Sequence, residues 1–132
     1  MSSDGYLLDA NALIALVLRE HEHHSRVSSW ASGASRLALC PIVEGALLRA
    51  LLRLGESQET ATGLLRLLYE DARFEFWADS ITYTEAELDH VIGHRQVTDA
   101  YLVALARSRG AELATLDRGL AAALPAGVLL IP

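Results

Sequence analysis

The chain contains no lysine, and this absence removes several classes of enzyme. All eleven basic residues are arginine. P-loop NTPases, Schiff-base enzymes and most phospho-aspartyl switches depend on an obligatory lysine, so their mechanisms are excluded. Cys40 is the only cysteine, which also excludes an intrachain disulfide and a zinc site built from several thiolates. A cytoplasmic location is the simplest expectation for such a chain.

Long apolar runs are missing as well. No segment approaches the roughly 20 apolar residues of a membrane-spanning helix, so no membrane association is expected. The N-terminal sequence MSSDGYLLD has no basic stretch before its apolar residues, which argues against a secretory signal. With 132 residues, of which 52% are hydrophobic, the chain is expected to form a single domain over residues 1–132. The net charge of −6 argues at first against a nucleic-acid partner, because phosphate binding usually shows as a basic surface.

Short apolar segments alternate with helical patterns along the whole chain. Strands are predicted at 6–8, 37–40, 74–77, 112–116 and 128–131, and helices at 12–19, 25–32, 41–54, 58–71, 98–109 and 118–124. Residues 79–96 are expected to form a short helix followed by a loop. No hairpin signal such as Asn-Gly occurs. This alternation predicts a three-layer α/β/α architecture with a central parallel sheet of about five strands.

The stretch VTDAYLVALARSRGAELATLD at 97–117 carries two aspartates at informative places. Thr98 is predicted to cap a helix that ends at Gly110, which puts Asp99 in the first turn. Asp117 directly follows a short predicted strand. In open α/β sheets, helix starts and the carboxyl ends of strands lie near the edge where ligands bind. Two carboxylates that meet there indicate a cation.

Two further acids have reasons to face the same edge. Asp9 follows the first predicted strand, and Asn11 is expected to cap the next helix; alone, Asp9 would be interpreted as an acid that favours the helix dipole. Glu44 lies one turn into the helix that begins at Pro41, in line with Leu47, Leu48 and Leu51. A carboxylate on an apolar stripe costs several kcal/mol unless it is paired or bound to metal. Local N–H groups at the helix start are the structural alternative for Glu44.

The histidines and the leucine-rich helix have plainer interpretations. The segment HEHH at 21–24 lacks the zinc spacing HExxH, because Ser25 stands where the second histidine belongs, so a solvated turn is expected. His90 and His94 are four residues apart, but Gly93 weakens a helix there, and both are expected to face solvent. Burial in the core is favoured for Leu64, Leu65, Leu67 and Leu68, with a subunit contact as the alternative.

Four carboxylates at one edge would raise one another's pKa values. A divalent cation resolves this repulsion, and an all-oxygen donor set favours Mg²⁺ or Mn²⁺ over zinc. Such a site can orient and deprotonate a water and stabilise the leaving oxygen of a phosphodiester.

Four segments resemble the motifs of one family, in the family's order. They are LLDANALIAL at 7–16, PIVEGALLRAL at 41–51, RQVTDAYLVALA at 95–106 and LATLDRGL at 113–120. Together they resemble the PIN-domain nucleases and, within that family, the VapC-type toxins of bacterial type II toxin–antitoxin pairs. The resemblance implies a Mg²⁺-dependent endoribonuclease that cleaves RNA, is usually a homodimer and is held inactive by a cognate VapB-type antitoxin.

The resemblance also implies roles for individual residues. Metal ligation is implied for Asp9, Glu44, Asp99 and Asp117, with Asn11 and Thr115 as supporting polar groups. Bound metal would offset the acidic charge, and Arg95 and Arg118 beside the motifs are then expected to hold phosphates.

Three other functions compete with the toxin. A PIN nuclease of RNA processing or quality control shares the chemistry, although the small size and the lack of an appended domain favour the toxin. A phosphoaspartate phosphatase or receiver-like domain would use Asp9 as acceptor; the phosphatases also need a second aspartate where Asn11 stands, and both kinds need a lysine. A PIN fold kept only as a catalytically silent binding module is the third, and four intact acids argue against it.

Overall fold

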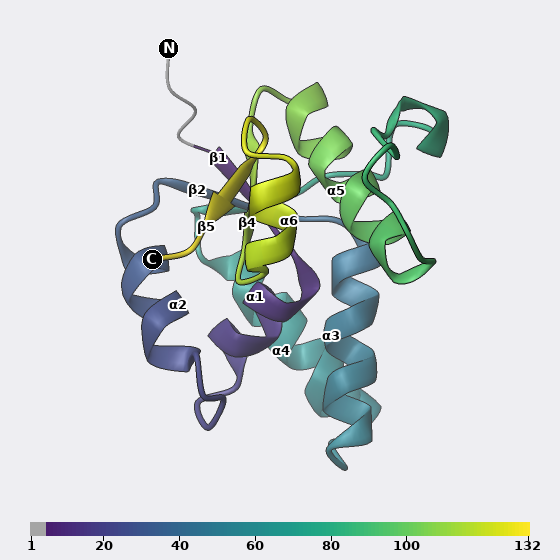
Figure 1. Cartoon of the computed structure of the whole chain (residues 1–132). Coiled ribbons are helices and arrows are strands. Elements are labelled where there is room, and N and C mark those ends of the chain that lie inside the picture. The colour runs from purple at the N-terminus through teal and green to yellow at the C-terminus, as the bar shows by residue number, and fades with distance from the viewer. Residues whose placement is uncertain (1–4) are drawn as a thin grey trace.

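A sheet of five parallel strands forms the centre of the molecule. The computed structural model describes residues 5–132, apart from the side chain of Arg95, so the phosphate-binding role predicted for Arg95 lies outside the described part. The strands are β1 (Gly5–Leu8), β2 (Arg36–Leu39), β3 (Phe74–Phe76), β4 (Glu112–Thr115) and β5 (Val128–Leu130). Their order is β3-β2-β1-β4-β5, and every pair is parallel (Figure 1). The predicted parallel sheet is confirmed, with strand bounds at most one residue from those predicted.

The strand β1 lies in the middle of the sheet and in the core. Leu7 pairs with Ala38 of β2 on one side and with Leu113 of β4 on the other. Leu7 and Leu8 point to opposite faces, and both are fully buried. A strand covered on both faces has no need of polar alternation, which explains why the consecutive residues Leu7 and Leu8 are both apolar.

Helices cover both faces of the sheet. They are α1 (Ala10–Val17), α2 (His24–Ser32), α3 (Pro41–Arg53), α4 (Gln58–Glu70), α5 (Arg95–Ser108) and α6 (Arg118–Ala123), with a 3₁₀ turn η1 (Tyr83–Glu85). α1 contacts α2 and α3, and α3 contacts α4, whereas α5 packs on β1 and β4, and α6 packs on β5 (Figure 1). Right-handed crossovers place the first four helices on one face and the last two on the other. The predicted three-layer architecture is therefore confirmed.

Two predicted helix starts are wrong, and in each case another polar group satisfies the backbone. α1 begins at Ala10, and its cap is Asp9 instead of Asn11. α5 begins at Arg95, so Thr98 is not its cap and Asp99 is not in its first turn. The Gln96 side chain accepts hydrogen bonds from the backbone N–H groups of residues 92 and 93 at 2.6 and 3.3 Å, and this closes the preceding loop without help from Thr98.

Helix ends agree better with the prediction. Gly55 and Gly110 follow α3 and α5 with φ of 94° and 68°, a backbone region that glycine adopts at little cost. The segment before α5 holds only η1 and loop. In α4 the core prediction holds in part: Leu64, Leu65 and Leu68 are half-buried and pack against the core, whereas Leu67 is 59% exposed. Within residues 5–132, none of the helices combines the length and the apolar character needed to cross a membrane.

Candidate functional site

The site lies where the direction of strand order reverses. From β1 the chain moves outward to β2 and β3, then returns across the sheet to β4 on the other side of β1. The crevice beyond the carboxyl ends of β1 and β4 is the place where open α/β sheets bind ligands. Asp9 follows β1 directly, Thr115 ends β4, and Asp117 comes two residues later.

Asp9 is fixed by both strands and by the helix it precedes. Its Oδ1 accepts the backbone N–H of Ala12 at 2.8 Å, and its Oδ2 accepts a hydrogen bond from the hydroxyl of Thr115. Its own backbone N–H donates to the carbonyl of Ala114 at 3.2 Å. Only 4% of Asp9 is exposed. The carboxylate is therefore held rigidly at the bottom of the crevice.

Thr115 connects Asp9 with Asp117. The Thr115 oxygen that donates to Asp9 also accepts the backbone N–H of Asp117 at 3.0 Å. Asp117 in turn caps α6, because its Oδ1 accepts the N–H of Leu120 at 3.1 Å. Asp117 itself is exposed. One aspartate is thus buried and the other faces the opening of the crevice.

The three aspartates act on one another electrostatically. The pKa of Asp9 is raised to about 6, mainly by burial, with a smaller contribution from the charges of Asp99 and Asp117; hydrogen bonds from Thr115 and Ala12 oppose the rise. The pKa of Asp99 is raised by burial and by the charge of Asp117. Three carboxylates that come from α5 and from the ends of β1 and β4 therefore share one region: the charges of Asp99 and Asp117 disfavour ionisation of Asp9, and the charge of Asp117 disfavours ionisation of Asp99.

Glu44 has a hydrogen-bond partner of its own. It is in the first turn of α3, and its Oε2 accepts a hydrogen bond from the Tyr69 hydroxyl of α4 at 2.6 Å. It makes no contribution to the raised pKa of Asp9 or Asp99. Burial and this hydrogen bond raise the pKa of Tyr69 far above its usual value. The partner of Glu44 is a tyrosine on another helix, which the local pattern around Glu44 did not reveal.

The carboxylate oxygens of this site are chemically suited to a hard divalent cation. Carboxylates are the ligands that Mg²⁺ and Mn²⁺ prefer, and a cation would offset the repulsion that raises the pKa values of Asp9 and Asp99. The arrangement is not a closed cage: within residues 5–132, no three or more His, Cys, Asp or Glu side chains converge as potential metal ligands. The predicted histidine turn likewise forms no metal cluster.

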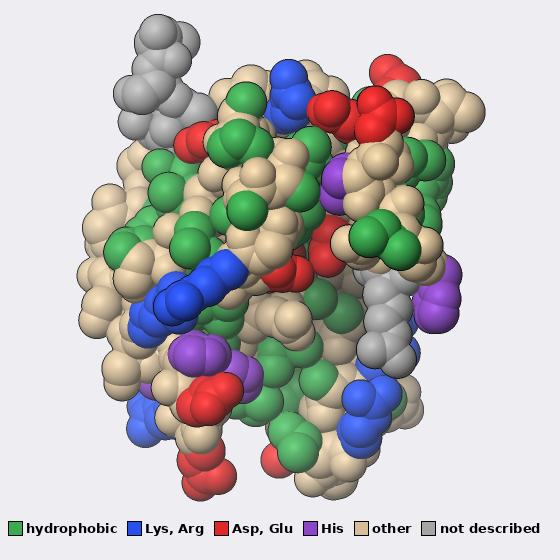
Figure 2. All heavy atoms as spheres, in the orientation of Figure 1, with side chains coloured by type: hydrophobic (Ala, Val, Ile, Leu, Met, Phe, Trp, Pro, Cys, Tyr) green, Lys and Arg blue, Asp and Glu red, His purple; other side chains and the backbone are tan. Residues whose placement is uncertain are grey.

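Asp117 borders two hollows on the surface. One is lined by Asp117 and five neighbours from α1, the turn after α1 and the end of β4, namely Asn11, His21, Glu22, His23 and Leu116. The other is lined by His90, Gln96, Asp99, Asp117, Gly119, Leu120 and Ala123. Figure 2 shows acidic side chains in the middle of this face, with arginine and histidine side chains to one side.

His90 is a site residue that the sequence prediction missed. Both of its ring nitrogens are buried and have no hydrogen-bond partner in the described part of the chain, and the residue lines the hollow that holds Asp99 and Asp117. The prediction that it faces solvent is wrong, whereas His94 is exposed as predicted. The local signal was weak, because the loop that carries His90 has no periodic pattern.

Comparisons with known proteins give the family. The PIN domain family model matches residues 6–123. Ribonuclease VapC29 of Mycobacterium tuberculosis is 47% identical over 116 residues, which are 87% of each chain. The structure of M. tuberculosis VapC20, a sarcin–ricin loop cleaving toxin, matches with a TM-score of 0.65 and 20% identity over 89% of this chain and 94% of that one. A toxin–antitoxin complex from Klebsiella pneumoniae matches with a TM-score of 0.63 and 21% identity over 94% and 95%. The chain belongs to the PIN-domain family and, within it, to the VapC group.

Proposed function

We propose that this chain is a Mg²⁺-dependent endoribonuclease and the toxin of a bacterial toxin–antitoxin pair, acting as a single nuclease domain over residues 1–132. The observation that carries the proposal is the electrostatic coupling of Asp9, Asp99 and Asp117 beyond the ends of β1 and β4. A site of clustered carboxylates suits a divalent cation and phosphodiester hydrolysis. The high identity to a protein named as a ribonuclease supports RNA as the substrate.

Within this proposal the four acids hold the cation, and two polar residues support them. When bound, Mg²⁺ (or Mn²⁺) supplies positive charge that lowers the pKa of a water and stabilises the leaving oxygen. Asp9 contributes a carboxylate that is already fixed by Ala12 and Thr115, so little reorganisation is needed on binding. The proposed ligands are Asp9, Glu44, Asp99 and Asp117, with Asn11 and Thr115 as the supporting groups.

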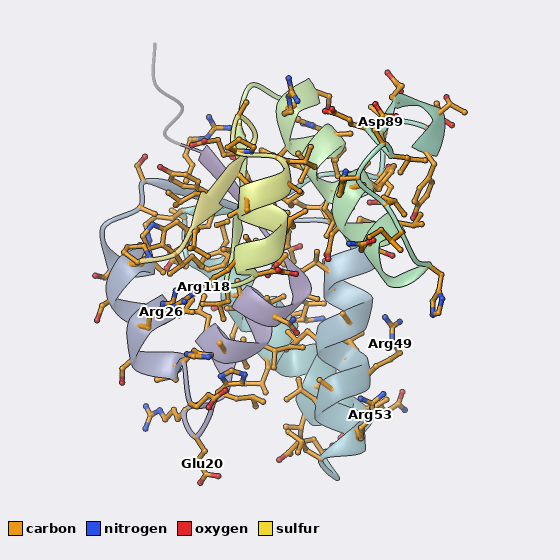
Figure 3. All side chains as sticks on the ribbon, in the orientation of Figure 1. Glu20, Arg26, Arg49, Arg53, Asp89 and Arg118 are labelled. Atoms are coloured by element: carbon orange, nitrogen blue, oxygen red, sulfur yellow. The ribbon has the colours of Figure 1, made fainter. Side chains whose placement is uncertain are left out.

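An arginine beside the site offers a positive charge that can bind the phosphates of RNA. Arg118 is the first residue of α6, directly after Asp117, and is exposed (Figure 3). Among the described residues its guanidinium makes no hydrogen bond or ion pair. A guanidinium can hold a phosphate through two parallel hydrogen bonds, so we expect the RNA backbone to cross the end of β4.

Two protein partners complete the proposal, a cognate VapB-type antitoxin and a second copy of this chain. The antitoxin is supported by the similarity to a solved toxin–antitoxin complex. The homodimer is supported by large apolar side chains that remain exposed on α3 and α4, since such surface is usually covered by a partner. They are Leu52 on α3, Leu54 directly after α3 and Leu67 on α4.

RNA cleavage should depend on a divalent cation. The purified full chain is expected to cleave end-labelled single-stranded RNA at internal positions in Mg²⁺, to lose this activity in EDTA, and to regain it when Mg²⁺ or Mn²⁺ is added back. Denaturing gels of the labelled RNA measure each condition. Cleavage that persists in EDTA would contradict a metal-dependent site, and soluble folded protein without any cleavage would indicate a silent binding module.

Growth experiments should separate a toxin from an RNA-processing nuclease. Expression of the chain alone in its host is expected to stop or slow growth, because a toxin cleaves RNA that the cell needs. Co-expression of the cognate antitoxin should restore growth. The measurement is a growth curve, with a blot to show soluble protein in both cultures. Normal growth in the presence of active nuclease would favour the processing role.

A further inference from the structure

The hollow beside the α1–α2 turn shares Asn11 and Asp117 with the proposed cleavage site, but its histidines have no role in the proposed cleavage chemistry. We call it the histidine hollow; its lining is Asn11, His21, Glu22, His23, Leu116 and Asp117, and its volume is about 410 Å³. It adjoins the site through Asp117, which also lines the hollow that holds Asp99. In Figure 2, histidine side chains lie just below a band of arginine side chains, and the acidic side chains at the middle of the face lie above and to the right of them. The histidine hollow therefore borders the candidate site directly.

Hydrogen bonding fixes which ring nitrogen of His21 carries the proton. The Nδ1 atom of His21 accepts the backbone N–H of His23 at 3.0 Å. A neutral imidazole has one acceptor and one donor nitrogen, so the proton of neutral His21 is on Nε2. That Nε2–H has no partner among the described residues, and it is not one of the buried unpaired atoms. His21 thus presents an accessible hydrogen-bond donor.

The lining of the histidine hollow suits a nucleobase better than a phosphate. The carboxylates of Glu22 and Asp117 lie in the same hollow and would repel a phosphate group. A base is flat and neutral and has both donors and acceptors on its edge. The rings of His21 and His23 lie 5.8 Å apart at 43° and offer aromatic surface. Bases of single-stranded RNA are commonly recognised by stacking on aromatic side chains, histidine included, and by hydrogen bonds to their edges.

We propose that the histidine hollow binds the nucleobase next to the scissile phosphate, and that the Nε2–H of His21 donates to an acceptor on that base. His21 is then a specificity-determining residue of the nuclease. This inference rests on the proposed function, because that function places the scissile phosphate beside Asp117. It also gives a use to the HEHH segment, whose spacing excludes the zinc motif.

Two substitutions separate base binding from the structural role of His21 in its turn. In His21→Asn the side-chain oxygen can still accept the N–H two residues on, as in an Asx turn, but the shorter side chain has no group at the Nε2 position. In His21→Gln the longer amide carries an N–H near the Nε2 position and gives up the turn acceptor. A base-binding role is therefore lost in the asparagine variant and kept in the glutamine variant, and a turn role shows the reverse.

Binding can be measured without cleavage. Fluorescence anisotropy of the full chain in EDTA, with labelled hexanucleotides of A, C, U or alternating G and A, gives a Kd for each sequence. The wild type is expected to prefer one sequence. His21→Asn should weaken that binding by about three- to tenfold, the usual effect of one neutral hydrogen bond, and leave the others unchanged; His21→Gln should keep the preference. Arg53→Gln, at the end of α3 (Figure 3) and outside the lining of the hollow, should not alter it.

Several results would overturn the inference. The inference fails if His21→Asn keeps the base preference of the wild type, or if only His21→Gln loses that preference. It also fails if the wild type shows no base preference or does not bind RNA. An effect of His21→Asn on antitoxin binding with none on RNA would assign the hollow to the protein partner instead. RNA cleavage in Mg²⁺ is measured separately. If the chain cleaves RNA but the His21 substitutions leave base preference unchanged, only this inference is rejected. If base-selective binding depends on His21 but no cleavage occurs, only the proposed function is rejected.

Discussion

Asp99→Asn is expected to abolish metal-dependent RNA cleavage, with a loss of at least roughly a hundredfold to a thousandfold in rate. Asp99 lies on α5, where burial and the charge of Asp117 raise its pKa, so it stands within the negative field that would attract a cation. Asparagine has nearly the same shape and removes that charge. Initial rates of cleavage of labelled RNA at fixed Mg²⁺ measure the effect, and sequencing of RNA ends after brief induction of both forms identifies the sites cut in cells.

The fold should survive this change. The neutral amide relieves repulsion with Asp117, so the thermal midpoint of the metal-free variant is expected to equal or exceed that of the wild type. Asp89→Asn is a matched control, since Asp89 is an exposed acid of the loop before α5 (Figure 3) and lines neither hollow beside Asp117. It should retain full activity. Cleavage that continues in the folded Asp99→Asn protein would show that the site has been misassigned.

Asp9→Asn should remove cleavage and at the same time stabilise the metal-free protein at neutral pH. The folded state raises the pKa of Asp9 from the ordinary 3.8 to about 6. Between these values the folded chain holds a proton that the unfolded chain has lost, so stability falls as pH rises through this window. Above pH 6 the cost of the buried charge reaches about 3 kcal/mol, at about 1.4 kcal/mol for each pKa unit.

Asparagine cannot ionise, so this pH dependence should disappear in the variant. The amide can still accept the N–H of Ala12, but its NH₂ group cannot accept the hydroxyl of Thr115, a loss of about 1 kcal/mol. A net gain of about 1–2 kcal/mol at pH 7.5 is expected, and little or none at pH 4.

Urea unfolding in EDTA at these two pH values measures the difference. Mg²⁺ should then stabilise the wild type more than the variant, since only a ligand that binds the folded state shifts the unfolding equilibrium. An Asp9→Asn protein that is less stable than the wild type at pH 7.5 would contradict this account of the buried charge.

Local sequence was sufficient for the elements and insufficient for the starts of two helices. Apolar segments without alternation gave the five strands, and glycines such as Gly55 and Gly110 gave the helix ends, because these signals act within a few residues. The starts of α1 and α5 were wrong because several polar side chains compete for the same backbone groups. Asp9 replaces Asn11 as a cap, and Gln96 closes the loop before α5, an outcome that depends on side-chain geometry.

Sequence by itself determined the composition of this site, which is carboxylates without lysine or clustered cysteine, and it placed Asp9 and Asp117 after strands. The tertiary structure alone decided which groups meet. Strand order sets β1 beside β4, so Thr115 can bridge Asp9 and Asp117. The packing of α3 on α4 brings the Tyr69 hydroxyl within hydrogen-bond distance of the Glu44 carboxylate. The turn after α1 brings His21 into the same hollow as Asp117. These contacts join residues far apart in the chain, whereas periodicity and capping act over only a few residues.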